Sequence, residues 1–403
     1  MTAQEFMDRE ARYGAHNYHP LPVVLEKGNG IYVWDTDGKR YFDFLSAYPA
    51  VNQGYCHPKI VKAMIDQAQK LALTSRAFYN DVLGEWEEYI TSYFGYDKVL
   101  PMNTGAEADE TALKLCRKWA YTKKGIPSNR AKIIVCEGNF HGRTISIISM
   151  STDSDSYGGF GPFTPGFIKI PYNDIATLEE KLKDPDVAGF LIEPIQGEAG
   201  VFVPQDGYLR KAYDLCKAHN VLFMADEVQT AIARTGKLLA CDHEGVYPDI
   251  LILGKAISGG MMPVSCVLSN DEIMLCIKPG EHGSTYGGNP IAAKVSMAAL
   301  EVIREEKLAE NAENLGQIFR KKIKALYSDM IEEVRGKGLL NAVVIKPKNG
   351  KTAWDVCLKL RDKGLLAKPT HEYIIRFAPP LIINQVELME AIGIIENTMA
   401  EFE

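Results

Sequence analysis

Two ionisable residues stand where apolar segments of the chain end. Asp226 follows the run 221–225, and Lys255 follows the run 250–253 after a single glycine, Gly254. Short apolar runs are typical of strands buried on both faces, and ligands bind beyond the carboxyl ends of parallel strands. An aspartate and a lysine at neighbouring strand ends suit one chemistry. The lysine forms a Schiff base with pyridoxal 5'-phosphate and moves protons, while the aspartate keeps the pyridine nitrogen protonated.

A phosphate group on such a cofactor needs an anion site. The segment Asn103-Thr-Gly-Ala-Glu107 precedes a stretch with helical periodicity, and Thr104 with Glu107 matches a capping box. Free N–H groups at a helix start bind phosphate, although helices without ligands begin in the same way. The segment 283–290 (Gly-Ser-Thr-Tyr-Gly-Gly-Asn-Pro) adds hydroxyl groups or is a plain turn before a helix. Neither motif by itself shows that a phosphate binds there.

Two further loops carry candidate side chains. Phe140 and Arg143 follow the apolar run 132–136, and they suit stacking on a flat heterocycle and holding a carboxylate. Taken alone, an arginine there is more often part of a surface ion pair. Glu193 and Glu198 follow the next apolar run, and paired carboxylates also occur in glycosidases and metal sites. We expect no metal site, because no histidine stands at ligand spacing.

The elements that position these residues alternate between strands and helices, which predicts an α/β fold. Strands are expected at 132–136, 187–192, 221–225 and 250–253, and helices at 58–72 and 106–121. The helix 106–121 carries an apolar stripe, formed by Ala108, Ala112, Leu115 and Trp119. We expect a large domain over 55–290 with a mostly parallel sheet.

Both ends of the chain have a different pattern. Residues 31–44 read as a hairpin that turns at Asp37-Gly38. The C-terminal part begins with one long helical stretch and continues with two strands and a closing helix, expected at 288–325, 340–346, 373–377 and 385–401. We expect a smaller α+β domain built from residues 1–54 and 291–403 together.

Composition narrows the class of protein. The chain has 403 residues, 46% hydrophobic and 24% charged, with a net charge of −7, which predicts a soluble globular protein and argues against nucleic-acid binding. No apolar window is long enough to span a membrane. The eight cysteines form no C-x-x-C pair and are expected to be reduced and buried. The first residues resemble neither a secretory nor a mitochondrial leader, so we expect a cytoplasmic protein, or a matrix protein if a transit peptide has been removed.

Six motifs, in order and spacing, resemble those of the class-III aminotransferases of pyridoxal phosphate fold type I. They are Asn103-Thr-Gly-Ala-Glu-Ala, Phe140-His-Gly-Arg-Thr, Glu193-Pro-Ile-Gln-Gly-Glu, Ala225-Asp-Glu-Val-Gln-Thr, Leu253-Gly-Lys and Gly283-Ser-Thr-Tyr-Gly-Gly-Asn-Pro. The likeness extends to both ends of the chain. It implies a large mostly parallel-sheet domain, a smaller α+β domain and pyridoxal 5'-phosphate as the cofactor.

The resemblance implies further cofactor contacts beside Lys255 and Asp226. Gln229 would approach the phenolic oxygen of the cofactor, and Phe140 would stack on its ring. Gly105 and Ala106 would offer backbone N–H groups to the phosphate. A homodimer with shared active sites is implied as well, because hydroxyl groups of the neighbouring subunit would reach that phosphate, from Ser284 and Thr285.

The resemblance is strongest to family members that transfer the δ-amino group of L-ornithine to 2-oxoglutarate, giving glutamate 5-semialdehyde and glutamate. Tyr18 and Arg143 would hold the α-carboxylate of ornithine, and Tyr48 would line the same pocket. The two carboxylates of 2-oxoglutarate would need Arg143 and Arg376. We expect Glu198 to pair with Arg376 while ornithine is bound and to give way to the dicarboxylate.

Two alternatives stay open. Acetylornithine or 4-aminobutyrate is a possible amino donor, but Tyr18 and Tyr48 favour a free α-amino acid over an N-acetylated one. A non-catalytic module that binds phosphate or a nucleotide is the alternative from a different class. It is disfavoured, because the chain has neither a P-loop nor an early G-x-G-x-x-G after a strand.

Overall fold

A seven-stranded sheet forms the centre of the molecule. The computed structural model describes residues 1–326, 328–348 and 350–402. In spatial order the strands of this sheet are β4 (Lys98–Met102), β10 (Ser265–Ser269), β9 (Ile250–Leu253), β8 (Leu222–Asp226), β7 (Val187–Ile192), β5 (Lys132–Cys136) and β6 (Phe167–Ile170). β10 runs antiparallel to both of its neighbours, β4 and β9, and the other four neighbouring pairs are parallel. The predicted mostly parallel sheet is confirmed.

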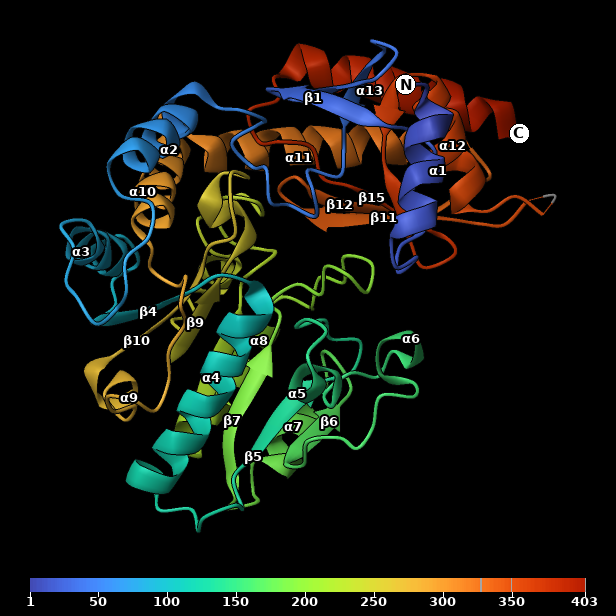
Figure 1. Cartoon of the computed structure of the whole chain (residues 1–403). Helices are drawn as coiled ribbons and strands as arrows, with labels where there is room; N and C mark the ends of the chain where they lie inside the picture. Colours follow the sequence, from blue (N-terminus) through green and yellow to red (C-terminus); the bar gives the residue numbers. More distant parts are fainter. Residues whose placement is uncertain (327, 349, 403) are drawn as a thin grey trace.

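Helices cover both faces of this sheet. Ile133 and Val135 of β5 pack with α4 (Gly105–Trp119), whereas Ile134 packs with α7 (Ile175–Lys181) and α8 (Tyr208–Ala218). Alternate residues of one strand therefore enter different cores, which explains why these strands read as unbroken apolar runs. Figure 1 shows α4 lying along the sheet in the lower part of the view. The apolar stripe predicted for this helix is buried as expected.

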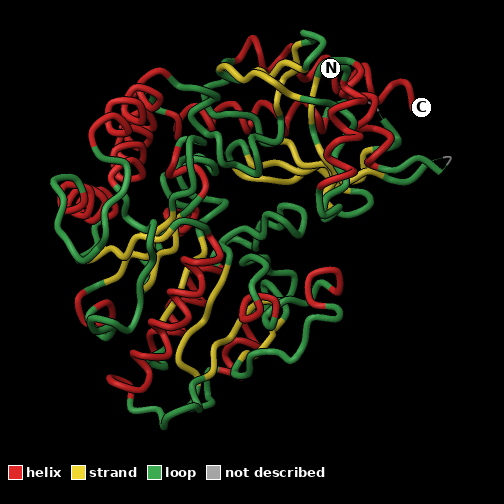
Figure 2. Tube along the Cα trace, viewed as in Figure 1, coloured by secondary structure: helices red, strands yellow, loops and turns green. Residues whose placement is uncertain are grey.

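Two four-stranded sheets lie in the upper part of the molecule (Figure 2). The first contains β1 (Leu25–Asn29), β2 (Tyr32–Asp35), β3 (Arg40–Asp43) and β13 (Leu365–Leu366), and the second contains β11 (Ile331–Lys337), β12 (Leu340–Ile345), β15 (Ile374–Phe377) and β14 (Lys368–Thr370). The predicted hairpin is confirmed as β2 and β3. Because β13 pairs with β3, both ends of the chain share one sheet. The domain boundaries at residues 54 and 291 stay a prediction.

The remaining helices flank these sheets. They are α1 (Ala3–Tyr13), α2 (Pro58–Lys70), α3 (Leu83–Phe94), α5 (Ile145–Ile148), α6 (Ser154–Tyr157), α9 (Asp271–Met274), α10 (Pro290–Glu305), α11 (Leu308–Lys324), α12 (Ala353–Asp362) and α13 (Gln385–Met399). The helical stretch expected over 288–325 is present, but it consists of two helices. The chain breaks into α10 and α11 at Lys307, whose φ of 52° is left-handed and ends a regular helix.

Seven of the eight cysteines are buried and all are free, as expected, while Cys56 is exposed. Among the described residues, no helix is long and apolar enough to cross a membrane.

Candidate active site

Lys255 begins a short 3-10 turn directly after β9 and Gly254. Its φ of 45° is left-handed, a strained conformation that non-glycine residues adopt mostly at functional sites. Its amine makes no hydrogen bond or ion pair within the described part of the chain. Burial lowers the pKa of this amine, the nearby Arg376 acts in the same direction, and Glu198 opposes them. A lysine without a partner in such surroundings is suited to act as a nucleophile.

Asp226 is the last residue of β8, the strand beside β9. It pairs in register with Ile252, so its carboxylate and Lys255 reach the same edge of the sheet. One carboxylate oxygen, Oδ1, accepts the N–H of Val228 at 3.0 Å. The other, Oδ2, lies 2.6 Å from Nδ1 of His141. The predicted neighbourhood of Asp226 and Lys255 is therefore present.

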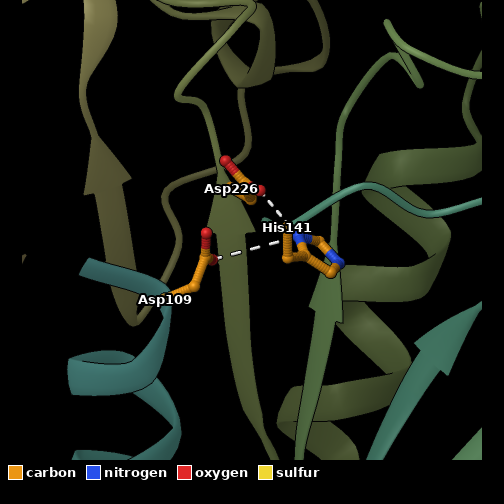
Figure 3. Close-up of side chains that lie close together, drawn as sticks. All are labelled: Asp109, His141 and Asp226. Carbon is orange, nitrogen blue, oxygen red and sulfur yellow. Dashed lines mark hydrogen bonds and ion pairs between the residues drawn. The ribbon is translucent and has the colours of Figure 1, made fainter. Parts of the chain in front are cut away.

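The structure adds two residues that sequence reasoning missed, His141 and Asp109. Figure 3 shows His141 reaching Asp226 from the loop after β5, with Asp109 approaching from α4. All three side chains are buried. Burial acts to lower the pKa of His141, but the hydrogen bond and charge of Asp226 outweigh it and raise that pKa. The signal in the sequence was an aspartate inside the apolar stripe of a helix, where a charge is costly.

Glu193 connects two of the predicted loops. Its carboxylate accepts the N–H of Phe140 at 2.7 Å and the N–H of Gly197 at 3.3 Å. Burial raises the pKa of Glu193 to about 7, while the nearby His141 works against that rise. The Glu193 carboxylate therefore joins the loop that carries Phe140 to the loop that carries Glu198. The sequence motifs did not indicate this role.

The start of α4 leaves backbone donors free. Thr104 and Glu107 form the predicted capping box. In the part of the chain that the structure describes, the N–H groups of Gly105 and Ala106 have no protein acceptor. The helix dipole and these free donors favour an anion at this end. Gly142 permits the packing here, because a Cβ on it would lie 2.7 Å from the Cβ of Ala106.

Arg376 lies on β15 and points at the Glu198 loop. Its Nη1 donates to Oε2 of Glu198 at 2.8 Å and to Oε1 of Gln229 at 3.2 Å. The guanidinium carbon also lies 5.2 Å from the centre of the Tyr48 ring. The ion pair expected from the sequence is present, and the charges of Glu198 and Arg376 both act on Lys255.

The two residues predicted to hold the substrate carboxylate, Arg143 and Tyr18, have fewer contacts with the rest of the site. Arg143 is exposed and its guanidinium carbon lies 5.4 Å from the centre of the Phe140 ring. Tyr18 is 71% exposed and acts electrostatically on Tyr48, but no described contact joins it to Arg143. The roles of these side chains as a substrate clamp stay a prediction.

The loop carrying Ser284 and Thr285 lies beside the start of α4. Within this chain, the Ser284 hydroxyl accepts two hydrogen bonds, from Nδ2 of Asn103 at 3.0 Å and from the N–H of Gly287 at 3.0 Å. Thr285 and the following Tyr286 are exposed. The described chain therefore shows a hydroxyl-bearing loop near the helix start, and its role toward a second subunit is untested.

Comparison with known proteins supplies the family. The family model for class-III aminotransferases matches residues 13–399. The chain belongs to the class-III aminotransferases. A Drosophila melanogaster protein named ornithine aminotransferase, mitochondrial, is 66% identical over 97% of this chain and 90% of its own length. A Rattus norvegicus protein of the same name is 62% identical over 100% of this chain and 91% of its own length.

Solved structures of other class-III aminotransferases match the whole fold. An ornithine aminotransferase from Toxoplasma gondii, described with partial occupancy of pyridoxal phosphate (PLP), has a TM-score of 0.98, with 49% identity over 100% of this chain and 95% of its own. An acetylornithine aminotransferase from Elizabethkingia anophelis has a TM-score of 0.92, with 59% identity over 100% of both chains. The predicted fold class is therefore confirmed.

Class-III aminotransferases use pyridoxal phosphate, and the residues present here fit that group. Among the residues that the structure describes, the amine of Lys255 has no partner, so it is free to react with an aldehyde. The N–H groups of Gly105 and Ala106 form an open cradle for a phosphate. Asp226, held by His141, supplies a carboxylate for a protonated ring nitrogen.

Proposed function

We propose that this aminotransferase transfers the δ-amino group of L-ornithine to 2-oxoglutarate, giving glutamate 5-semialdehyde and glutamate. The observation that carries the proposal is the ion pair between Arg376 and Glu198 beside Lys255. The two substrates differ in charge where they would meet this pair. Ornithine brings one carboxylate and two cationic amines, whereas 2-oxoglutarate brings two carboxylates. A site for both needs a second arginine whose charge can be covered and uncovered.

Each residue around Lys255 has its own role in this reaction. When bound, pyridoxal phosphate supplies an aldehyde carbon for the amine and a ring that accepts electrons. Asp226 would hold the proton at the ring nitrogen, Phe140 would stack on the ring, and Gln229 would approach its phenolic oxygen. Lys255, whose lowered pKa leaves more of its amine unprotonated near neutral pH and so able to accept a proton, would take and return the proton at the carbon that carries the amine.

Substrate orientation follows from three more side chains. Arg143 and Tyr18 hold the α-carboxylate of ornithine, and this places its far amine toward Lys255. Tyr48 lines the same pocket, with its ring beside Arg376. In the second half-reaction Arg143 and Arg376 hold one carboxylate each, and Glu198 moves aside. Bidentate arginine–carboxylate pairs give this orientation its precision.

One observation supports acetylornithine as a second candidate amino donor. The Elizabethkingia anophelis protein, 59% identical to this chain, is named an acetylornithine aminotransferase. Tyr18 and Tyr48 argue for the free amino acid, because an N-acetyl group would need the space near these rings. The fly and rat proteins named ornithine aminotransferase support the same choice.

The experiment that tests the proposal determines which amino group of ornithine supplies the nitrogen of the glutamate formed. The purified holoenzyme is given 2-oxoglutarate and ornithine labelled with nitrogen-15 at either the δ or the α position, and glutamate is analysed by mass spectrometry. Label from the δ position alone is the expected result. Acetylornithine and 4-aminobutyrate are assayed in parallel, and a higher kcat/KM for either would overturn the choice of ornithine.

A matched variant separates catalysis from phosphate binding. Lys255→Ala should abolish the yellow colour that borohydride bleaches and should abolish transfer, while the fold is checked by circular dichroism. A colourless wild-type protein would instead indicate a phosphate-binding module.

The working unit in this proposal is a homodimer with shared active sites. Tyr286 is an exposed aromatic side chain in the loop expected at the contact. Phe78 and Tyr79 are also exposed, and they follow the segment 73–76, which lines one pocket together with Ser284 and Thr285. A second copy covering them would bring its Ser284 and Thr285 to the phosphate. The compartment belongs to the proposal too. A cytoplasmic location is our expectation, while the mitochondrial names of the fly and rat relatives make the matrix the alternative for cell fractionation.

A further inference from the structure

Asp109 is a buried acid without a function in the scheme above. Its side chain is only 1% exposed, and it enters from α4 below the His141–Asp226 pair (Figure 3). Its Oδ1 lies 3.9 Å from Nδ1 of His141 and has no hydrogen-bond partner in the described chain. Nε2 of His141 is also buried, and no described residue is its hydrogen-bond partner. Unpaired buried polar atoms are costly, so their placement calls for an explanation.

Charged groups on several neighbouring elements act on Asp109. They are Glu110 on the same helix, Asp226 at the end of β8, His141 after β5, Glu193 after β7 and Lys255 after β9. Burial raises the pKa of Asp109 well above its usual range, and the three carboxylates add to that effect against the opposing charge of Lys255. Asp226, whose Oδ2 lies 2.6 Å from Nδ1 of His141, is the partner of that ring, whereas Asp109 at 3.9 Å stands outside hydrogen-bonding distance.

We propose that Asp109 is a positioning residue, which carries a proton in the cofactor-free protein and releases it when the protonated ring of the cofactor docks against Asp226. This inference rests on the proposed place of Asp226 beneath that ring. The incoming ring adds a second cation beside a single carboxylate, and a second carboxylate then becomes favourable. The O–H bond of Asp109 breaks, its electron pair stays on the carboxylate, and the proton passes to water. Two carboxylates, those of Asp226 and Asp109, would then offset the charges of the ring and of His141.

The release is measured with a ligand that docks without reacting. Pyridoxine 5'-phosphate has the ring and the phosphate but no aldehyde, so Lys255 cannot trap it. Its binding to the apoprotein is followed by calorimetry between pH 6 and 9, in two buffers with different ionisation enthalpies. Wild type should release up to one proton more per site than Asp109→Asn. Over the pH range in which this proton is released, the ratio of wild-type to variant affinity for pyridoxine 5'-phosphate should rise by up to about tenfold per pH unit.

A second measurement needs no ligand at all. Nitrogen-15 NMR of the apoprotein follows the titration of His141. If Asp109 is neutral, Asp109→Asn should leave the midpoint of His141 unchanged, because one uncharged group replaces another of the same shape. An ionised Asp109 would instead support the imidazolium, and its replacement would lower that midpoint by about one unit or more. A lowered midpoint would overturn the proposal.

Controls keep the outcomes separate. Asp206→Asn makes the same chemical change at an exposed position and should match wild type in both measurements. Thermal unfolding verifies that Asp109→Asn is folded. Equal proton release by wild type and Asp109→Asn at every pH overturns the inference alone. Failure of wild type to bind pyridoxine 5'-phosphate overturns the proposed cofactor site and the inference with it. A divalent cation found in the apoprotein and lost in the variant also overturns it, because the three side chains would then be ligands.

Discussion

The Arg376–Glu198 ion pair joins a fixed partner to a displaceable one. The arginine side chain is 4% exposed and the glutamate side chain 31%, with Nη1 and Oε2 2.8 Å apart. Gln229 holds the arginine from a second side at 3.2 Å. An incoming carboxylate can therefore replace Glu198 without exposing or moving the arginine. The exposed partner has water to move into, so the exchange leaves no buried charge unpaired.

Replacing Glu198 by glutamine should change the balance between the two half-reactions. Glu198→Gln leaves the Arg376 charge uncovered, which favours dicarboxylates over the cationic chain of ornithine. We expect kcat/KM for ornithine to fall about tenfold and the glutamate half-reaction to become faster, as measured by stopped-flow absorbance. Transfer from the α-amine of labelled ornithine should increase. The exposed Glu179→Gln serves as the control, and an unchanged product profile in Glu198→Gln would contradict the masking role.

Gly142→Ala should weaken cofactor binding. An alanine Cβ there would lie 2.7 Å from the Cβ of Ala106, and the left-handed φ of 128° adds strain. The start of α4 must then shift, and its phosphate donors shift with it. We expect the dissociation constant for pyridoxal phosphate to rise at least about tenfold in equilibrium dialysis. Gly159→Ala has a similar left-handed backbone but open space, so it should bind normally. Equal affinities in the two variants would refute the steric argument.

The stability of the apoprotein should depend on the ionisation of Glu193. Its pKa is raised to about 7 from a usual 4.5, chiefly by burial. The folded state therefore holds this proton more tightly than the unfolded state. Its contribution is fully present below about pH 4.5 and is lost as the pH rises to about 7, a total of about 3 kcal/mol. Glu193→Gln cannot titrate, so urea unfolding should show a flatter pH profile for this variant. Parallel profiles would show that Glu193 ionises normally.

Hybrid dimers should reveal whether the active sites are shared. One chain carries Lys255→Ala and the other carries Ser284→Ala with Thr285→Ala, with different affinity tags for purification of the mixed dimer. If the loop serves the neighbouring subunit, one site of the hybrid combines an intact lysine with an intact loop. About half of the wild-type activity per dimer should return, although each parent dimer is impaired. A hybrid no more active than its parents would place the loop in its own subunit's site.

The candidate site was predictable where one residue type and its place after a strand already specify the chemistry. Asp226, Lys255 and the capping box at Thr104 were found in this way and lie where expected. His141 lay inside a quoted motif without a role, because a sequence does not show which side chain it meets across the fold. Asp109 was missed for the same reason, and so was the role of Glu193, which the sequence analysis had named only as one of two candidate carboxylates. Their partners come from elements far away in sequence.

The amino-acid sequence by itself determined the main secondary structure and the family. Apolar runs and helical stripes depend on local periodicity, which is readable along one chain. It did not determine that 288–325 would break at Lys307, or that β4 and β10 would extend the sheet. Those outcomes depend on packing and pairing between distant segments. The pairing of Arg376 with Glu198 was implied by the resemblance, but only the tertiary structure gave this pair its distance and burial and gathered three acids around His141, because burial and charge acquire their values when the chain is folded.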